Sequence, residues 1–251
     1  MKYPLRLGLF LVGAIGLAIL YGLAIARMPG EHESLYGRLI NQLSQPQQHI
    51  RDAVTAVNFD YRGFDTLGEE FILFISVTGA IVLLRETYEK KKEEQMDAIT
   101  PGRAVSQTDA VRTWTLALTG PTVVFGVYIV IHGQLTPGGG FQGGVVLATA
   151  PLLIYLGESF EVFKRVTSTP LIEITEAIGA GGYAIIGIIG WLAGSWFLQN
   201  VFPLGDQNNP SVFTGGTVPA INLATGIEVT AGFTLLLSAF LQQTLADRGD
   251  S

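Results

Sequence analysis

Cysteine is absent from this 251-residue chain, and histidine is scarce. Without cysteine the chain has no disulfide, no thiolate ligand for a metal and no cysteine nucleophile. The three histidines, His32, His49 and His132, are scattered and form no H-x-x-x-H pair that would place two metal ligands on one helix face. We therefore expect no metal site, no cofactor and no enzymatic activity in this chain.

Charged residues are also few, at 14% of the chain against roughly 25% in an average soluble domain. The net charge is −6, and the basic residues gather in one cluster instead of forming a basic face, which argues against binding to nucleic acid. Hydrophobic residues make up 48% of the chain and fall into long uninterrupted runs. These features predict an integral membrane protein.

The apolar runs predict an all-α, polytopic fold with six transmembrane helices. A helix needs about 20 apolar residues to cross the ~30 Å hydrocarbon core of a bilayer. The runs cover Leu7–Ala26, Leu67–Leu84, Trp114–His132, Gly144–Leu156, Ile174–Leu198 and Ala220–Leu241. The first run has a second interpretation as a signal peptide, because its last residues resemble a small-residue cleavage site, although its apolar core exceeds the ~7–15 residues typical of a signal.

Lysine and arginine predict how the helices are oriented in the cell membrane. They concentrate between the second and third runs, between the fourth and fifth, and near both termini, so these parts are expected on the cytoplasmic side. Four arginines in 27–62, a segment expected outside, conflict with this rule for the first helix. The charged stretch divides the chain into a two-helix module (1–86), a cytoplasmic linker (87–112) and a four-helix domain (113–251).

Glu228 is the acidic residue placed deepest in an apolar run. A carboxylate at the centre of a membrane helix costs at least ~2.5 kcal/mol, so such residues usually face a partner or an ion path. We expect Glu228 to carry protons or cations. The alternative is that it joins helices by hydrogen bonding, in the company of Thr225 and Thr230.

Two further pairs of glutamates begin apolar runs. Glu173 and Glu176 share one helix face, where they either shuttle a proton or offset the dipole at a helix N-terminus. Glu69 and Glu70 are adjacent and point about 100° apart, so at most one of them can face a channel.

The remaining candidates lie near the ends of the predicted helices. Glu158 and Glu161 precede Lys164 and Arg165, which predicts an interfacial cluster of ion pairs. His132 ends the third run, where it either transfers protons or anchors the following loop by a hydrogen bond.

A glycine-rich loop separates the third and fourth runs. Its residues are Pro137, Gly138, Gly139, Gly140, Phe141, Gln142, Gly143 and Gly144. The G-x-G-x-x-G pattern within it binds dinucleotides only after a β-strand, and here the flanks are apolar helices. Glycine permits tight turns and close backbone approach, so we expect a packed helical hairpin. Six glycines in the fifth run, between 179 and 194, likewise predict close contact with neighbouring helices.

The loop, together with the preceding His132-Gly133-Gln134, resembles the signature of the B subunits of Mrp-type multisubunit sodium/proton antiporters. The segment around Glu228 is similar to the last helix of those subunits, where the acidic residue is commonly aspartate. The residues from Asp60 to Glu69 resemble a two-helix element at the end of the antiporter A subunit, also found as an E-type subunit of membrane-bound hydrogenases, and its glutamate falls on Glu69.

This resemblance implies an accessory subunit that works with other membrane subunits in the lipid bilayer to exchange sodium ions for protons. It gives Glu228 and Glu69 a role in the ion path or its gate. The alternative is a structural scaffold within a redox-driven ion-pumping complex of the hydrogenase type.

Overall fold

The computed structural model describes residues 3–27, 35–94, 108–202 and 204–248. Within these ranges all regular elements are helices, which confirms the all-α prediction. The chain divides into two compact units, Met1–Leu39 and Ile40–Ser251. The first unit contains α1 (Tyr3–Ala26), and α2 (Leu35–Gln48) crosses the division.

Five helices of the second unit are long and apolar enough to cross a membrane. They are α4 (Gly63–Glu94), α5 (Asp109–Ile131), α6 (Gly140–Gly157), α8 (Thr169–Leu192) and α9 (Val218–Arg248). The short elements are α3 (Ala53–Ala56), the π-helical turn η1 (Val57–Tyr61) and α7 (Phe160–Val166). The apolar part of α1, Phe10–Ala26, falls short of this length criterion, so six crossings remain a prediction.

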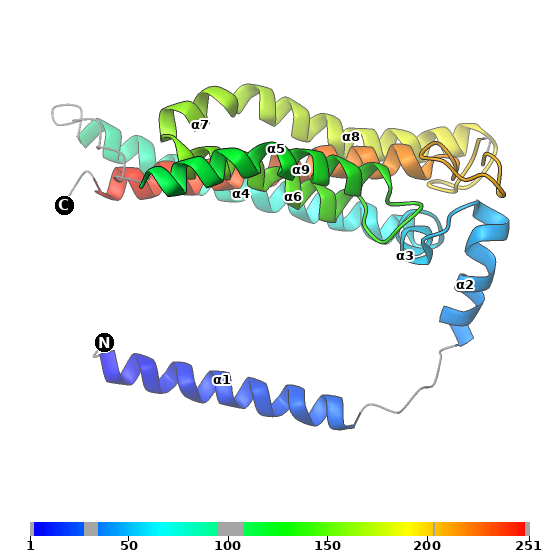
Figure 1. Cartoon of the computed structure of the whole chain (residues 1–251), viewed down its shortest axis with the longest axis horizontal. Coiled ribbons are helices and arrows are strands. Elements are labelled where there is room, and N and C mark those ends of the chain that lie inside the picture. The colour runs from blue at the N-terminus through cyan, green and yellow to red at the C-terminus, as the bar shows by residue number, and fades with distance from the viewer. Residues whose placement is uncertain (1–2, 28–34, 95–107, 203, 249–251) are drawn as a thin grey trace. The chain divides into compact units, whose positions relative to one another are not determined.

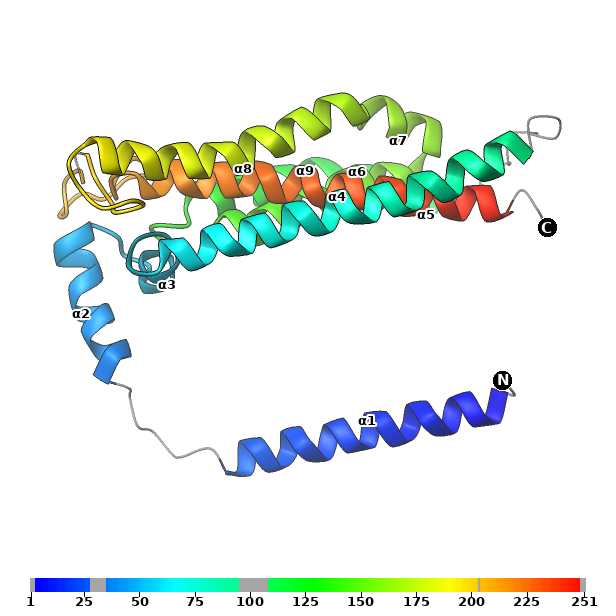
Figure 2. The same ribbon diagram turned by 180° about the vertical axis from the view of Figure 1, so that it is seen from behind.

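Helix α9 forms the centre of the second unit. It packs against α4, α6 and α8, and α5 is paired with α6 on the outside (Figure 1). The reverse view shows α4 and α8 running along α9 (Figure 2). Small residues permit this close packing, because a Cβ atom at Gly144 of α6 would come within 2.7 Å of Val229. In α8, where the sequence predicted glycines at helix contacts, a Cβ atom at Gly179 would come within 2.5 Å of Glu228 of α9.

Polar and aromatic residues join the ends of α4, α8 and α9. Tyr183 of α8 is fully buried, stacks at an angle on Phe59 of η1, and donates a hydrogen bond of 2.9 Å to the carbonyl of Gly63. In the loop between α8 and α9, the backbone N–H of Asn200 donates to Asp60 Oδ1 at 2.8 Å. These contacts fix the first residues of α4 against the rest of the unit.

Several predicted boundaries differ from the structure. Helix α6 begins at Gly140 instead of Gly144, after Gly139 completes the turn with φ of 129°. Helix α8 ends at Leu192 instead of Leu198, before a turn in which Gly194 has φ of 80°. Helix α4 continues to Glu94, into the predicted linker, and residues 95–107 lie outside the described part of the chain. The compact units divide between Leu39 and Ile40, and the division into a two-helix module, a linker and a four-helix domain stays a prediction.

Candidate ion site

Glu228 lies in the middle of the central helix. It follows Val218, the first residue of α9, by ten residues, a rise of ~15 Å along the helix. Its side chain has no exposed surface. Since the hydrocarbon core of a bilayer is ~30 Å thick, this carboxyl group lies near the membrane midplane if α9 crosses the bilayer.

Glu70 of α4 faces Glu228 across the contact between the two helices. It is 1% exposed, and the charges of the Glu70 and Glu228 carboxyl groups act on each other. Within the described residues none of the four carboxyl oxygens has an aligned hydrogen-bond donor. Two ionised carboxylates can only accept, so a hydrogen bond between them requires a shared proton.

Glu176 of α8 brings a third carboxyl group to the same region. It is 4% exposed, and its charge acts on Glu228. Two glycines make the approach of α8 to α9 possible. A Cβ atom at Gly179 would meet the Glu228 backbone nitrogen at 2.5 Å, and one at Gly232 would meet Glu176 Oε1 at 3.0 Å. Each carboxyl-bearing residue therefore packs against a glycine of the other helix.

The pair of acidic residues formed by Glu70 and Glu228, which we call the acidic pair, lacks a cationic partner among the described residues. The ion pairs found there, Arg62 with Asp65 and Arg112 with Glu158, lie elsewhere. An isolated buried charge is costly unless it is neutralised. A single proton or monovalent cation held between the two carboxyl groups would reduce the charge of the ionised pair from two to one. The described residues contain no group of three or more ligands that could hold a metal ion.

The structure buries some of the glutamates singled out in the sequence and exposes others. Glu228 and Glu176 are buried near each other, whereas Glu173 and Glu69 are exposed. Glu70, which the sequence resemblance ranked below Glu69, occupies the interior position. The signal was present in the periodicity of α4, because the buried Thr66, Glu70 and Val77 share one face of that helix.

His132 lies apart from the acidic pair at the end of α5. It is half-buried and stacks on Tyr128 with a centroid distance of 4.1 Å. Its Nδ1 lies 3.1 Å from the Tyr128 carbonyl oxygen. These contacts are those of an anchor at the helix terminus.

The glycine-rich loop packs onto α9 as a tight hairpin. The backbone N–H of Gly140 donates to Asn222 Oδ1 at 3.0 Å, and a Cβ atom at Gly140 would approach Thr225 to 2.5 Å. A Cβ atom at Gly143 would meet Val130 of α5 at 2.4 Å. The glycines of this hairpin hold α5 and α6 close to the helix that carries Glu228.

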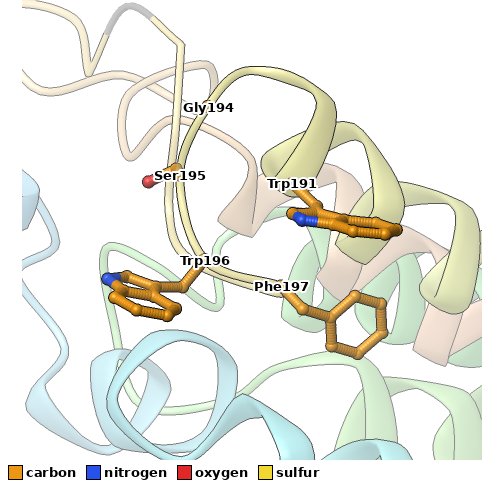
Figure 3. Close-up of a pocket in the computed structure, with 5 residues that line it drawn as sticks. All are labelled: Trp191, Gly194, Ser195, Trp196 and Phe197. Atoms are coloured by element: carbon orange, nitrogen blue, oxygen red, sulfur yellow. The ribbon is translucent and has the colours of Figure 1, made fainter.

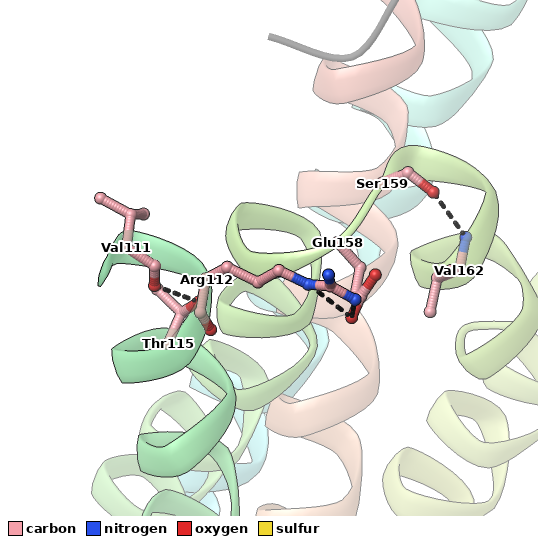
Figure 4. Close-up of polar contacts among 6 residues, drawn as sticks. All are labelled: Val111, Arg112, Thr115, Glu158, Ser159 and Val162. Carbon is pink, nitrogen blue, oxygen red and sulfur yellow. Dashed lines mark hydrogen bonds and ion pairs between the residues drawn. The ribbon is translucent and has the colours of Figure 1, made fainter. Parts of the chain in front are cut away.

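Glu158 forms an ion pair, but with a different residue from those expected. Its Oε1 accepts a hydrogen bond of 2.7 Å from Arg112 of α5, which joins the start of α5 to the end of α6 (Figure 4). The sequence had suggested Lys164 and Arg165 as partners, and both of these side chains are exposed on α7.

A separate hollow of about 620 Å³ lies where α8 ends. It is lined by Trp191, Gly194, Ser195, Trp196 and Phe197 (Figure 3). The two indole rings are largely exposed, at 67% for Trp191 and 81% for Trp196. Aromatic residues at a helix end are typical of the membrane–water interface, and no ionisable side chain lines this hollow.

Residues 110–235 match a protein family that is described as a domain related to the MnhB subunit of the Na⁺/H⁺ antiporter. An uncharacterised protein of Methanocaldococcus jannaschii is 31% identical, over 90% of this chain and 87% of the relative. A Staphylococcus aureus protein named as antiporter subunit mnhB2 is 30% identical, over 52% of this chain and 96% of the relative.

Two solved structures are similar over nearly the whole chain. One is a chain of the archaeal membrane-bound sulfane sulfur reductase, a respiratory membrane complex, with 31% identity and a TM-score of 0.67 over 96% of this chain and 99% of that one. The other belongs to the Mrp complex of Dietzia sp., with 19% identity and a TM-score of 0.71. The match to the latter covers 95% of this chain but 26% of that chain, and shows similarity of fold alone.

Proposed function

Because the chain belongs to the family of domains related to the MnhB subunit of Na⁺/H⁺ antiporters, we propose that it is an accessory subunit of a multisubunit cation/proton antiporter. In this proposal the acidic pair, Glu70 and Glu228, binds and passes the transported ion. The supporting observation is the burial of both carboxyl groups side by side, without a cationic partner among the described residues.

The acidic pair can exchange one proton for one cation. With a single proton shared between Glu70 and Glu228, the pair carries one negative charge, and two protons leave it neutral. Oxygen ligands suit hard cations such as sodium. Because close carboxylates repel each other, binding of a cation and binding of the second proton compete for the same site.

Glu176 provides a step between the acidic pair and the membrane surface at the start of α8. Glu173 precedes it by one helical turn and is exposed. A proton that leaves Glu228 can therefore pass to Glu176 and then to Glu173 along one face of α8. We expect the start of α8, and both termini, to lie on the cytoplasmic side of the cell membrane.

Other membrane subunits are required in this proposal. The large apolar side chains exposed on the helices include Ile72 and Ile75 of α4 and Val124 and Phe125 of α5. These faces suit lipid or neighbouring subunits. A complete transporter is commonly built from paired structural repeats. In this proposal the chain contributes one acidic pair without an intramembrane lysine, and the partner subunits supply the rest of the ion path.

A second candidate function is that of a scaffold in a redox-driven membrane complex. The observation that favours it is the similarity to a chain of the sulfane sulfur reductase complex along almost the full length of both chains. In that case the acidic pair joins α4 to α9 through a shared proton and carries no ions.

Ion exchange by the purified whole complex in sealed vesicles distinguishes these functions. We compare the native chain with Glu70→Gln and Glu228→Gln, and use Glu69→Gln as the matched control because its side chain is adjacent but exposed. Cation-dependent proton movement should fall at least tenfold in the first two variants and remain unchanged in the control. Subunit stoichiometry is measured on the same samples.

Unchanged exchange in all variants of an intact complex would reject the ion-path role and leave the scaffold role. Loss of subunits from the Glu70→Gln and Glu228→Gln complexes, with normal exchange by the remainder that assembles, would also favour the scaffold. Replacing sodium by potassium or lithium in the same vesicles identifies the transported cation.

A further inference from the structure

An apolar groove opens beside α9, on the side of α9 that faces away from α4. The floor is formed by α9, one wall by α5 and α6, and the other wall by α8 with the turn that precedes it. Its volume is about 370 Å³. Residues that define its extent include Leu147, Pro151, Val166, Leu171, Leu223 and Thr234.

The polar atoms of the groove are already used within their own helices. Four threonines line it, and each hydroxyl donates to a backbone carbonyl of the preceding helical turn: Thr167 to Phe163, Thr175 to Leu171, Thr230 to Gly226 and Thr234 to Thr230, at 2.6–2.8 Å. The groove therefore offers methyl and methylene groups to an occupant. Such a surface suits a hydrocarbon chain and does not suit a file of water molecules.

The dimensions suit a single extended chain. On α9 the groove runs from Leu223 to Thr234, which corresponds to ~16 Å of helix. One leaflet contributes about half of the ~30 Å hydrocarbon thickness, so this length matches the reach of one acyl chain. A helix about 10 Å across would occupy about 1,300 Å³ over the same length, well above the volume of the groove.

Two basic residues stand at the end of the groove where α7 meets α8. Val166 and Thr167 line the groove, and Lys164 and Arg165 immediately precede them in the last turn of α7. Both basic side chains are exposed, and the neighbouring Glu158 is paired with Arg112 instead. An anionic headgroup is therefore attracted to this end of the groove.

We propose that this groove binds one acyl chain of an anionic phospholipid, whose headgroup is held by Lys164 and Arg165. The lipid would fill the gap between the α5–α6 hairpin and α8, two parts that both pack on α9. The proposal is independent of the function assigned to the acidic pair, because it concerns the opposite side of α9.

Photo-cross-linking to the intact complex tests the proposal. The probe is phosphatidylglycerol with a photoactivatable group near the end of one acyl chain, present as a minor component of phosphatidylcholine vesicles. Peptide mass spectrometry should place adducts on 171–175 and 223–234. A phosphatidylcholine probe with the same acyl chain should give at least fivefold fewer adducts there.

Variants separate headgroup binding from chain binding. Lys164→Gln combined with Arg165→Gln should reduce labelling by the phosphatidylglycerol probe roughly five- to tenfold, and Arg51→Gln, a change of an exposed basic residue outside the groove, should not. Thr175→Phe should fill part of the groove and abolish its labelling. Ile178→Phe, on an exposed part of the same helix, is the matched control.

Three results would overturn the proposal. Labelling spread evenly over the exposed apolar faces would show that the groove has no preference for lipid. Equal labelling by the two headgroup probes would reject the role of Lys164 and Arg165. Protection of the groove by a partner subunit, or by α1 of the same chain, would assign it to a protein segment.

Discussion

Gly179 of α8 lies against the backbone of Glu228 of α9, so close that a Cβ atom at position 179 would meet the Glu228 nitrogen at 2.5 Å. Because Gly179 has no side chain, α8 can approach α9 closely enough to bury Glu228 between them. Burial of Glu228 and the close crossing of α8 over α9 depend on the same position.

Replacing Gly179 by alanine should destabilise the complex. The added methyl group meets backbone atoms that cannot rotate away, and overpacking of this kind costs about 1–3 kcal/mol. Thermal unfolding of the detergent-solubilised complex measures the effect. Gly181→Ala is the control, because a Cβ atom there meets nothing within 4 Å. Equal midpoints for the two variants would contradict the close crossing.

The double variant Glu70→Gln with Glu228→Gln should transport ions no more slowly than the slower of the two single variants. If the carboxyl groups share one proton, the first substitution already destroys the shared site, and the second has little left to remove. Exchange rates in vesicles give the comparison. Losses that multiply, with each residue contributing its own factor, would mean that Glu70 and Glu228 act as separate sites.

Asn200→Ala should loosen the loop between α8 and α9. Its Oδ1 accepts hydrogen bonds from the backbone N–H and the hydroxyl of Thr217, at 2.8 and 3.1 Å, and its Nδ2 donates to Gln48. Leaving buried groups unpaired costs about 1–3 kcal/mol. Hydrogen exchange of the peptides from 200 to 217 should accelerate, whereas Asn208→Ala, at an exposed position, should leave it unchanged.

Asp60 should make stability depend on pH. Burial raises the pKa of Asp60 above its ordinary value, and the hydrogen bond from the Asn200 N–H lowers it by less. The folded protein thus binds this proton more tightly than the unfolded chain does. The resulting stabilisation is complete at pH values below the ordinary pKa and is lost as the pH rises through the raised one.

Asp60→Asn keeps a side-chain oxygen for the Asn200 N–H and removes the titration. We expect the melting temperature of this variant to vary less with pH across the acidic range than that of the native complex. The two curves should differ most above the raised pKa of Asp60. Parallel curves throughout would mean that Asp60 does not contribute to the pH dependence.

The sequence predicted the helices better than the pairing of acidic residues. Apolar runs located α4, α5, α6, α8 and α9 because length and hydrophobicity are local properties. The choice between Glu69 and Glu70 depends on which face of α4 meets α9, and that contact joins parts of the chain far apart in sequence. Thr66 and Glu70 lie on the buried face of α4, whereas the family resemblance had favoured Glu69.

The roles of individual glycines were also not predictable from the sequence. Gly179 and Gly181 are two residues apart in the same run, yet a Cβ atom would clash at the first and be accommodated at the second. Only the rotation of α8 about its axis distinguishes them. The ion pair of Glu158 illustrates the same limit, since its partner Arg112 is distant in sequence and the nearby Lys164 is not used.

The central position of α9 has a consequence for biosynthesis. Ribosomes make α4, α6 and α8 before the helix on which all three pack. Roughly 160 residues separate Glu70 from Glu228, so at 5–20 residues per second the first carboxyl group waits on the order of 8–30 s for the second. During that interval α4 enters the membrane with Glu70 unpaired. We expect membrane insertion factors to hold the early helices until α9 arrives.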